Sequence, residues 1–158
     1  MGRTRGFTLI ELLVAIAVLA ILSLIALPSF LDRRVRSQIA EGLPLADLAK
    51  PAVEAAWRNK QPLPADNAAA GLPPPDKIVN QVVRSVTVDN GAIHIVFGNQ
   101  AVGALKDKTV TVRPAGVDDA RIVPVTWLCG TAPAPDKATA QGANRTDVPA
   151  GLLPVRCR

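Results

Sequence analysis

Aromatic, histidine and cysteine residues are scarce in this chain of 158 residues. Tyrosine is absent, and three phenylalanines and two tryptophans make up the 3% of aromatic residues. Single-stranded nucleic acids bind to platforms on which bases stack on aromatic side chains, so this composition disfavours such a platform. One histidine and two cysteines are too few to form a four-ligand zinc site without carboxylate help. We therefore expect no metal and no other cofactor.

Motifs of catalysis and nucleotide binding are also missing. The chain has no nucleophile elbow, no Walker loop and no dinucleotide fingerprint. The single histidine, His94, lies between Ile93 and Ile95 in a strand-like run and would point to the opposite face from them. We expect it to face solvent rather than to bind a ligand. No catalytic residue is predicted, and the protein is expected not to be an enzyme.

The first 31 residues contain the most informative pattern. A short basic segment ends at Gly6, Phe7 follows, and residues 12–27 carry no charge. An ordinary secretory signal places its apolar stretch before the cleavage site, whereas here the small residue comes first. Residues 12–31 would span roughly 30 Å as a helix, which is the thickness of the hydrocarbon core of a bilayer. Residues 7–31 are therefore expected to form a hydrophobic transmembrane helix.

The run Arg-Gly-Phe-Thr-Leu-Ile-Glu-Leu-Leu at residues 5–13 resembles the class III leader of type IV prepilins. The resemblance implies that a prepilin peptidase removes residues 1–6 by cleavage after Gly6, N-methylates Phe7, and so prepares the chain for assembly into a filament. In that filament, residues 7–31 would form the core helix, and Pro28 matches the proline that kinks or loosens the pilin stem helix. The bulk of the chain would then lie outside the cytoplasm.

Glu11 is an ionisable residue at the start of this apolar helix. An ionisable residue costs about 2.5–3.5 kcal/mol on insertion scales at the centre of a membrane helix and less near its edge, and it marks function by default. In one interpretation its carboxylate lies at the level of the lipid headgroups. The family resemblance favours a second, in which Glu11 pairs with the amine of Phe7 on a neighbouring subunit. Such a pair would set the register, because a displaced subunit leaves a charge buried and alone.

Beyond Pro28 the apolar residues recur at steps of three and four, which is typical of an amphipathic helix that packs on a globular head. These residues are Val35, Ile39, Leu43, Ala46, Ala49, Val53 and Trp57. We predict one long helix over residues 8–59, bent or interrupted at Pro44 and Pro51, because an internal proline loses a backbone hydrogen bond. Residues 61–77, rich in proline, alanine and glycine, are expected to form a loop.

Four strands are predicted after the loop. Asn-Gly between the β-rich runs 82–88 and 92–97 indicates a hairpin. Residues 108–113 and 122–129 alternate as strands do, and the face of the last strand that is expected to pack on the helix carries Val123, Val125, Trp127 and Cys129. The fold class is α+β, with the long N-terminal helix packed on a four-stranded antiparallel sheet.

Cys129 and Cys157 are expected to be oxidised to a disulfide in an exported chain. The chain-entropy estimate for a loop of about 29 residues is roughly 3–4 kcal/mol. The arrangement resembles the D-region of type IVa pilins, here residues 129–157. The resemblance thus implies a pilin fold with a C-terminal disulfide-bounded loop, in which residues 32–158 form the amphipathic helix and the globular head.

The resemblance implies a structural subunit of a type IV pilus, a homo-oligomer that serves adhesion, twitching motility or DNA uptake. The subunit would be anchored in the inner membrane by residues 7–31, and the pilus assembly machinery of that membrane would then place it in an extracellular filament. If the pilin binds DNA weakly, we expect the contacts to be salt-sensitive and to come from the C-terminal basic residues Lys137, Arg145, Arg156 and Arg158.

Other functions stay open at this point. Within the family these are a minor pilin, a DNA-binding competence pilin and a type II secretion pseudopilin. The Cys-bounded terminal loop disfavours the pseudopilin, and the intact Glu11 favours a major over a minor pilin. Outside the family the alternative is a single-span membrane protein with an exposed β-rich domain, which would lack processing at Gly6-Phe7.

Overall fold

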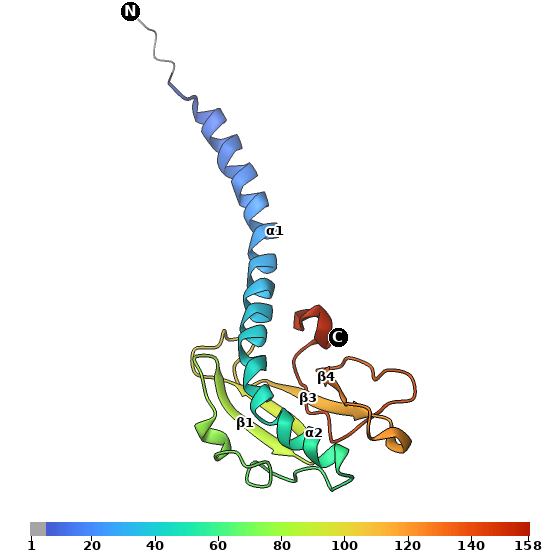
Figure 1. The fold of residues 1–158 in the computed structure, drawn as a ribbon. Coiled ribbons are helices and arrows are strands. Elements are labelled where there is room, and N and C mark those ends of the chain that lie inside the picture. The colour runs from blue at the N-terminus through green and yellow to red at the C-terminus, as the bar shows by residue number, and fades with distance from the viewer. Residues whose placement is uncertain (1–5) are drawn as a thin grey trace, which may run out of the picture. The chain divides into compact units, whose positions relative to one another are not determined.

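The computed structural model describes residues 6–158, and for residues 25–29 it describes the backbone but not the side chains. The chain divides into two compact units, Met1–Arg34 and Val35–Arg158. Residues 1–5, which hold most of the expected leader, lie outside the described residues. Figure 1 shows the order of the elements along the chain.

The first helix, α1, runs from Leu9 to Gly42. Helical backbone continues through position 28, so Pro28 does not end the helix. A 3-10 turn (Leu43–Leu48) with Pro44 in its first turn follows, and then a second helix, α2 (Lys50–Arg58), with Pro51 in its first turn. Proline is tolerated there because the backbone N–H groups of a first turn have no partner within the helix. The helix predicted over residues 8–59 is therefore interrupted where its prolines indicated.

No helix in the described part of the chain is both long and apolar enough to cross a membrane. The transmembrane half expected for residues 7–31 is therefore not found in the structure.

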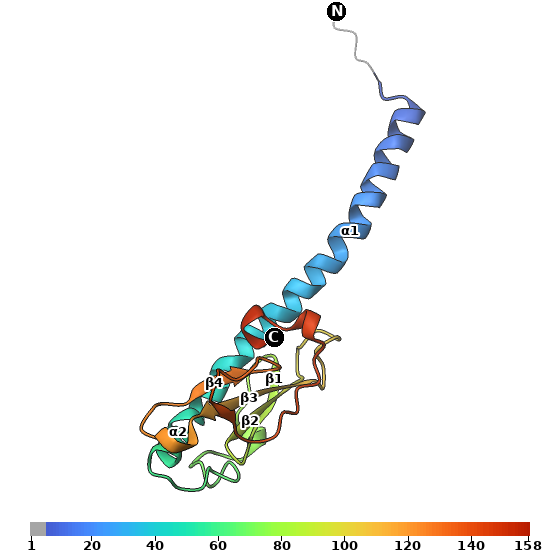
Figure 2. The same cartoon turned by 90° about the vertical axis from the view of Figure 1, so that its right-hand side faces the viewer.

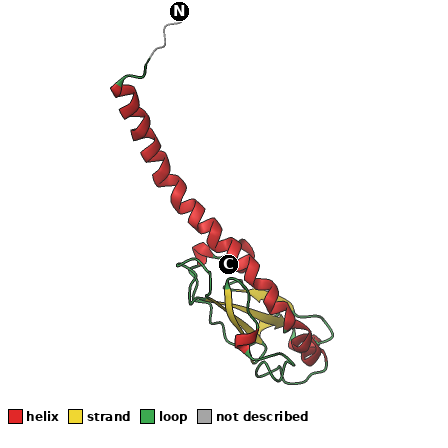
Figure 3. Ribbon diagram, turned by 90° about the vertical axis from the view of Figure 1, so that its left-hand side faces the viewer, coloured by secondary structure: helices red, strands yellow, loops and turns green. Residues whose placement is uncertain are grey.

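The head contains one antiparallel sheet in the order β1-β2-β3-β4, with a short fifth strand paired to β3. Figure 2 shows strands β1 to β4 of this sheet, and Figure 3 shows the sheet and the loops around it from the opposite side. The strands are β1 (Val83–Asp89), β2 (Ala92–Phe97), β3 (Thr109–Gly116), β4 (Thr126–Cys129) and β5 (Thr139–Ala140). The predicted α+β fold is confirmed, and β5 is an addition to the four predicted strands.

The β1–β2 hairpin turns at Asn90 and Gly91, whose φ angles are 48° and 82°. Two consecutive positive φ values are typical of the type I′ turn, whose twist matches that of the flanking strands. The predicted loop over residues 61–77 contains no α-helix or strand, only a 3-10 turn at Pro75–Lys77.

The core of the head forms where the helical segments meet the sheet. All seven apolar positions predicted from Val35 to Trp57 are buried. Five of them join strand residues such as Val83 and Phe97 in one cluster. A Cβ on Gly42 would lie 2.7 Å from the Phe97 ring and 2.8 Å from Val83, so glycine permits the close approach of α1 to the sheet.

The prediction for the last strand was wrong in its first half. β4 begins only at Thr126, and Val123, which was expected in the core, is 51% exposed. A 3-10 turn (Asp118–Ala120) occupies the connection after β3, and Pro124 has no N–H to donate to a ladder. The expected burial holds for Val125 and Cys129, while Trp127 is only partly buried.

Candidate functional site

The N-terminal unit exposes large apolar side chains from Phe7 to Leu24 and again at Phe30 and Leu31. Phe7 is 84% exposed, and most of the large apolar side chains described after it are exposed as well. These are Leu9, Ile10, Leu12, Leu13, Val14, Ile16, Val18, Leu19, Ile21, Leu22, Leu24, Phe30 and Leu31. Contiguous apolar surface of this extent marks an interaction site, and a helix that is apolar all round is normally buried in its working state. The exposed part of α1, up to Leu31, is therefore a candidate interaction surface.

Glu11 forms a capping box with Thr8 at the start of α1. The backbone N–H of Glu11 donates to Thr8 Oγ1 at 3.3 Å, and Thr8 donates through its backbone N–H and its hydroxyl to Glu11 Oε2, each at 3.5 Å. This reciprocal arrangement satisfies N–H groups that have no partner within the helix. We did not predict this capping box, although Thr-x-x-Glu before an apolar run is its known sequence signature.

The structure brings together the residues to which the leader resemblance gave roles. Gly6, Phe7, Thr8 and Glu11 line one open concavity. Both long hydrogen bonds to the Glu11 carboxylate use Oε2, so within the described residues Oε1 has no hydrogen-bond partner. Pro28, the remaining residue assigned to assembly, lies in α1, and its side chain is outside the described residues.

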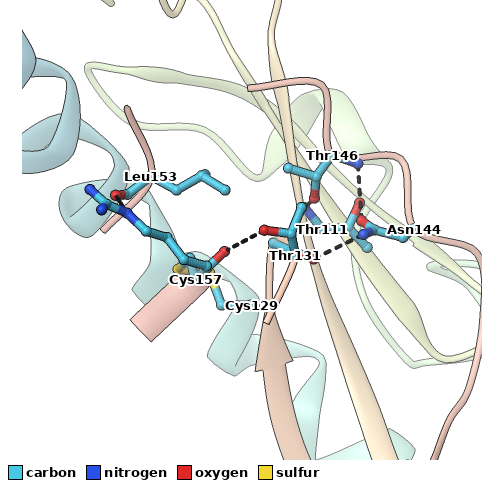
Figure 4. The surroundings of a disulfide bond; sticks show 9 residues. Thr111, Cys129, Thr131, Asn144, Thr146, Leu153 and Cys157 are labelled. Carbon is cyan, nitrogen blue, oxygen red and sulfur yellow. Dashed lines mark hydrogen bonds between the residues drawn. A yellow bond between two sulfur atoms is a disulfide. The ribbon is translucent and has the colours of Figure 1, made fainter. Parts of the chain in front are cut away.

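Cys129 and Cys157 form a disulfide, as the sequence predicted. Both cysteines are buried, and the segments that contain them lie in contact (Figure 4). The N–H of Thr131 donates to Cys157 O at 2.9 Å. Gly130 has a φ of 61°, and a Cβ there would lie 2.5 Å from the same oxygen. The C-terminal turn (Val155–Cys157) is thereby held against the end of β4.

Polar contacts anchor the C-terminal loop at residues 144–147. The amide of Asn144 donates to Gly130 O at 2.9 Å, and the N–H of Thr111 donates to Thr146 Oγ1 at 3.0 Å (Figure 4). The N–H of Thr109 donates to Asp147 Oδ1 at 2.6 Å. The paired residues are 14 to 38 positions apart in the sequence, so no local sequence pattern predicts these contacts.

His94 is buried, contrary to its expected exposure. It is 2% exposed, with Nδ1 2.9 Å from Thr111 Oγ1. That hydroxyl accepts the N–H of Arg145 at 3.0 Å, so residues of the C-terminal loop cover the sheet face that we expected to be open. Burial and the positive charge of Arg145 lower the pKa of His94 below 6.5, and Asp89 opposes this shift. His94 Nε2 lies 3.9 Å from Asp89 Oδ2 and is buried without a hydrogen bond.

The four basic residues predicted for DNA contact differ in their surroundings. Arg145 forms an ion pair with Asp89, and Arg158 Nε donates to Leu153 O at 3.0 Å. Lys137 and Arg156 are exposed, and Arg156 lines a pocket that also includes Lys50 and Trp127. Two of the four residues thus have internal contacts that hold the C-terminal loop and its terminus.

Comparison with known proteins agrees with this geometry. Residues 35–158 match the family described as pilin (bacterial filament), and residues 1–27 match the prokaryotic N-terminal methylation motif. The chain is 32% identical to the type IV major pilin protein PilE1 of Neisseria gonorrhoeae over 98% of its own length and 87% of that protein. It is 32% identical to a fimbrial protein of Neisseria meningitidis serogroup B, over 98% of this chain and 94% of the relative. Identity to the fimbrial protein EcpC of Eikenella corrodens is 38%, over 80% of this chain and 82% of the relative. With the N-terminal motif, the antiparallel sheet and the C-terminal disulfide in place, the chain belongs to the pilin family of bacterial filament subunits.

Proposed function

We propose that the chain is the major subunit of a type IV pilus and polymerises through its N-terminal helix after cleavage between Gly6 and Phe7. The observation that carries this proposal is the exposed apolar surface that begins at Phe7. A surface of this kind is stabilised when sister helices cover it. Pilins are structural proteins, and we propose that this chain likewise catalyses no reaction.

Processing would create a positively charged group that can pair with the Glu11 carboxylate. Cleavage at Gly6 leaves an ammonium group on Phe7, which can be N-methylated without loss of its charge. This group of one subunit would bind the Glu11 carboxylate of the next, because Oε2 makes only long hydrogen bonds to Thr8 and Oε1 has no hydrogen-bond partner among residues 6–158. In an apolar helix bundle a misaligned subunit would leave both charges unpaired, so the pair sets the register of assembly.

Before assembly, we propose, the subunit waits at the inner membrane, where a prepilin peptidase and the pilus assembly machinery act on it. The match of residues 1–27 to the N-terminal methylation motif supports this location. The finished filament would lie outside the cell and serve adhesion, twitching motility or DNA uptake. Exposed Lys137 and Arg156 would be the sites of weak DNA binding, since Arg145 and Arg158 hold internal contacts.

The composition of sheared surface filaments tests the proposed function. Mass spectrometry should find this chain as the most abundant protein, beginning at N-methylated Phe7. A chain found only in trace amounts within filaments would be a minor pilin, and a chain that keeps residues 1–6 in filaments would contradict the proposed processing. A chain found only in the membrane, with filaments absent, would support the single-span alternative.

A further inference from the structure

We propose that Ile122 and Val123 of one subunit insert into a pocket between the 61–77 loop and β1 on the head of a neighbouring subunit. The inference rests on the proposed function, because the partner is a second copy of this chain in the filament. It adds a specific contact between heads to the packing of the N-terminal helices.

Ile122 and Val123 form an apolar projection on the connection between β3 and β4. Ile122 is 88% exposed and Val123 is 51% exposed. Next to them, the guanidinium of Arg121 lies 4.6 Å from the centre of the Trp57 ring and 3.6 Å from the Asp118 carboxylate. The N–H of Val123 donates to Ala120 O at 2.9 Å. A projection that is already ordered loses little conformational entropy when it binds.

The receiving pocket lies beside β1 and has a volume of about 300 Å³. Its walls are mainly apolar and include Ala68, Leu72, Pro74, Pro75 and Thr87, and Asp66 also lines the pocket. The buried side chain of Asn67 fixes these walls, since its amide donates to Pro73 O at 3.1 Å and to Val86 O at 3.0 Å. Asn67 Oδ1 in turn accepts the N–H of Val88 at 2.7 Å. The pocket is therefore preformed.

The positions of the projection and the pocket suit an open filament. β1 and β4 are the first and last strands in the order β1-β2-β3-β4, so the pocket and the projection lie at opposite edges of the sheet. In Figure 1 the connection before β4 and the segment before β1 lie on opposite sides of the head. A subunit cannot fill its own pocket in this arrangement. Two different patches at opposite edges give a heterologous contact, which generates a filament when it does not close into a ring.

Cysteine cross-linking in assembled filaments tests the contact directly. We would replace Ile122 and Ala68 together, as Ile122→Cys with Ala68→Cys, in the full chain, shear the filaments and separate them without reductant. The expected result is a ladder of disulfide-linked multimers that collapses on reduction. Each single variant, and the matched pair Val155→Cys with Ala68→Cys, should give no ladder. Val155 is a suitable control because it is also apolar and 84% exposed. Filaments of the Ile122–Ala68 pair without a ladder would overturn the inference.

A charge substitution covers the case in which the cysteine pair fails to assemble. Ile122→Glu should lower the yield of sheared filaments at least tenfold, while the processed monomer accumulates with its native disulfide. Val155→Glu should leave the yield within twofold of wild type. Wild-type yield from Ile122→Glu, or an equal loss from both variants, would overturn the proposed contact. Absence of wild-type filaments would instead contradict the proposed function, so the two failures are distinguishable.

Discussion

The guanidinium of Arg145 forms an ion pair with the carboxylate of Asp89, and the pair joins the C-terminal loop to the end of β1. The Asp89 carboxylate is only 26% exposed, and the ring of His94 lies beneath the pair. Thr111 completes the arrangement, because its hydroxyl accepts the N–H of Arg145 and contacts His94 Nδ1. The sole histidine of the chain therefore lies where the C-terminal loop covers the sheet.

Mild acid should destabilise the head through His94. The pKa of His94 is lowered in the folded protein, so below pH 6.5 the unfolded chain binds a proton that the folded chain does not. The contribution of His94 to the stability is fully present above pH 6.5 and is lost as the pH decreases towards the folded pKa, by at most about 1.4 kcal/mol per pH unit. Thermal unfolding of the full chain in detergent measures this. The His94→Gln variant should show a flatter profile between pH 5 and 6.5, and an unchanged profile would contradict the assignment.

Substitutions of the two charged neighbours should move the pKa of His94 in opposite directions. Removal of the positive charge in Arg145→Ala should raise the pKa, and removal of the negative charge in Asp89→Asn should lower it further. One histidine gives one imidazole signal, so an NMR titration reports the shift without assignment problems. If the pKa of His94 shifts in the same direction in both variants, burial alone controls that pKa. Lys137→Ala is the control, because it also removes a positive charge, but one that is not paired with Asp89.

Replacement of both cysteines by serine should lower the thermal midpoint and expose only part of the C-terminal loop to protease. The chain-entropy estimate places the loss at roughly 3–4 kcal/mol. Cleavage should occur first in residues 132–138, because Asn144, Thr146 and Asp147 anchor the later segment to Gly130 and β3. Asn144→Ala with the disulfide intact should instead loosen the later segment. Early cleavage at residues 144–147 in the serine variant would show that these anchors depend on the disulfide.

Glu11→Gln separates helix capping from pairing between subunits. Glutamine at this position preserves a capping box with Thr8, but it removes the negative charge. If Glu11 pairs with the amine of Phe7, both Glu11→Gln and Glu11→Val should abolish sheared filaments while the monomer is still processed and folded. Thr8→Ala removes the cap at a cost of about 1 kcal/mol and should still permit filaments. Loss of filaments in Thr8→Ala together with normal filaments in Glu11→Gln would assign Glu11 to capping alone.

The sequence by itself determined the elements that depend on local patterns. Steps of three and four placed Val35, Ile39 and Trp57 in the core, since a helix presents such residues on one face. Asn-Gly placed the β1–β2 turn, because both residues tolerate positive φ. The interruption of the helix near Pro44 likewise followed from the covalent structure of proline. The processing and assembly roles of Gly6, Phe7 and Glu11 stay predictions from the leader motif.

Only the tertiary structure decided which surfaces are covered. Strand alternation placed His94 on the face of β2 opposite to Ile93 and Ile95. It could not show that a loop from far along the chain covers the face that carries His94. The same alternation placed Val123 in the core, whereas the chain turns before β4 and leaves that side chain exposed. Periodicity reports which residues share a face. Whether that face is buried depends on segments far away in the sequence, and here side chain to backbone hydrogen bonds hold those segments in place.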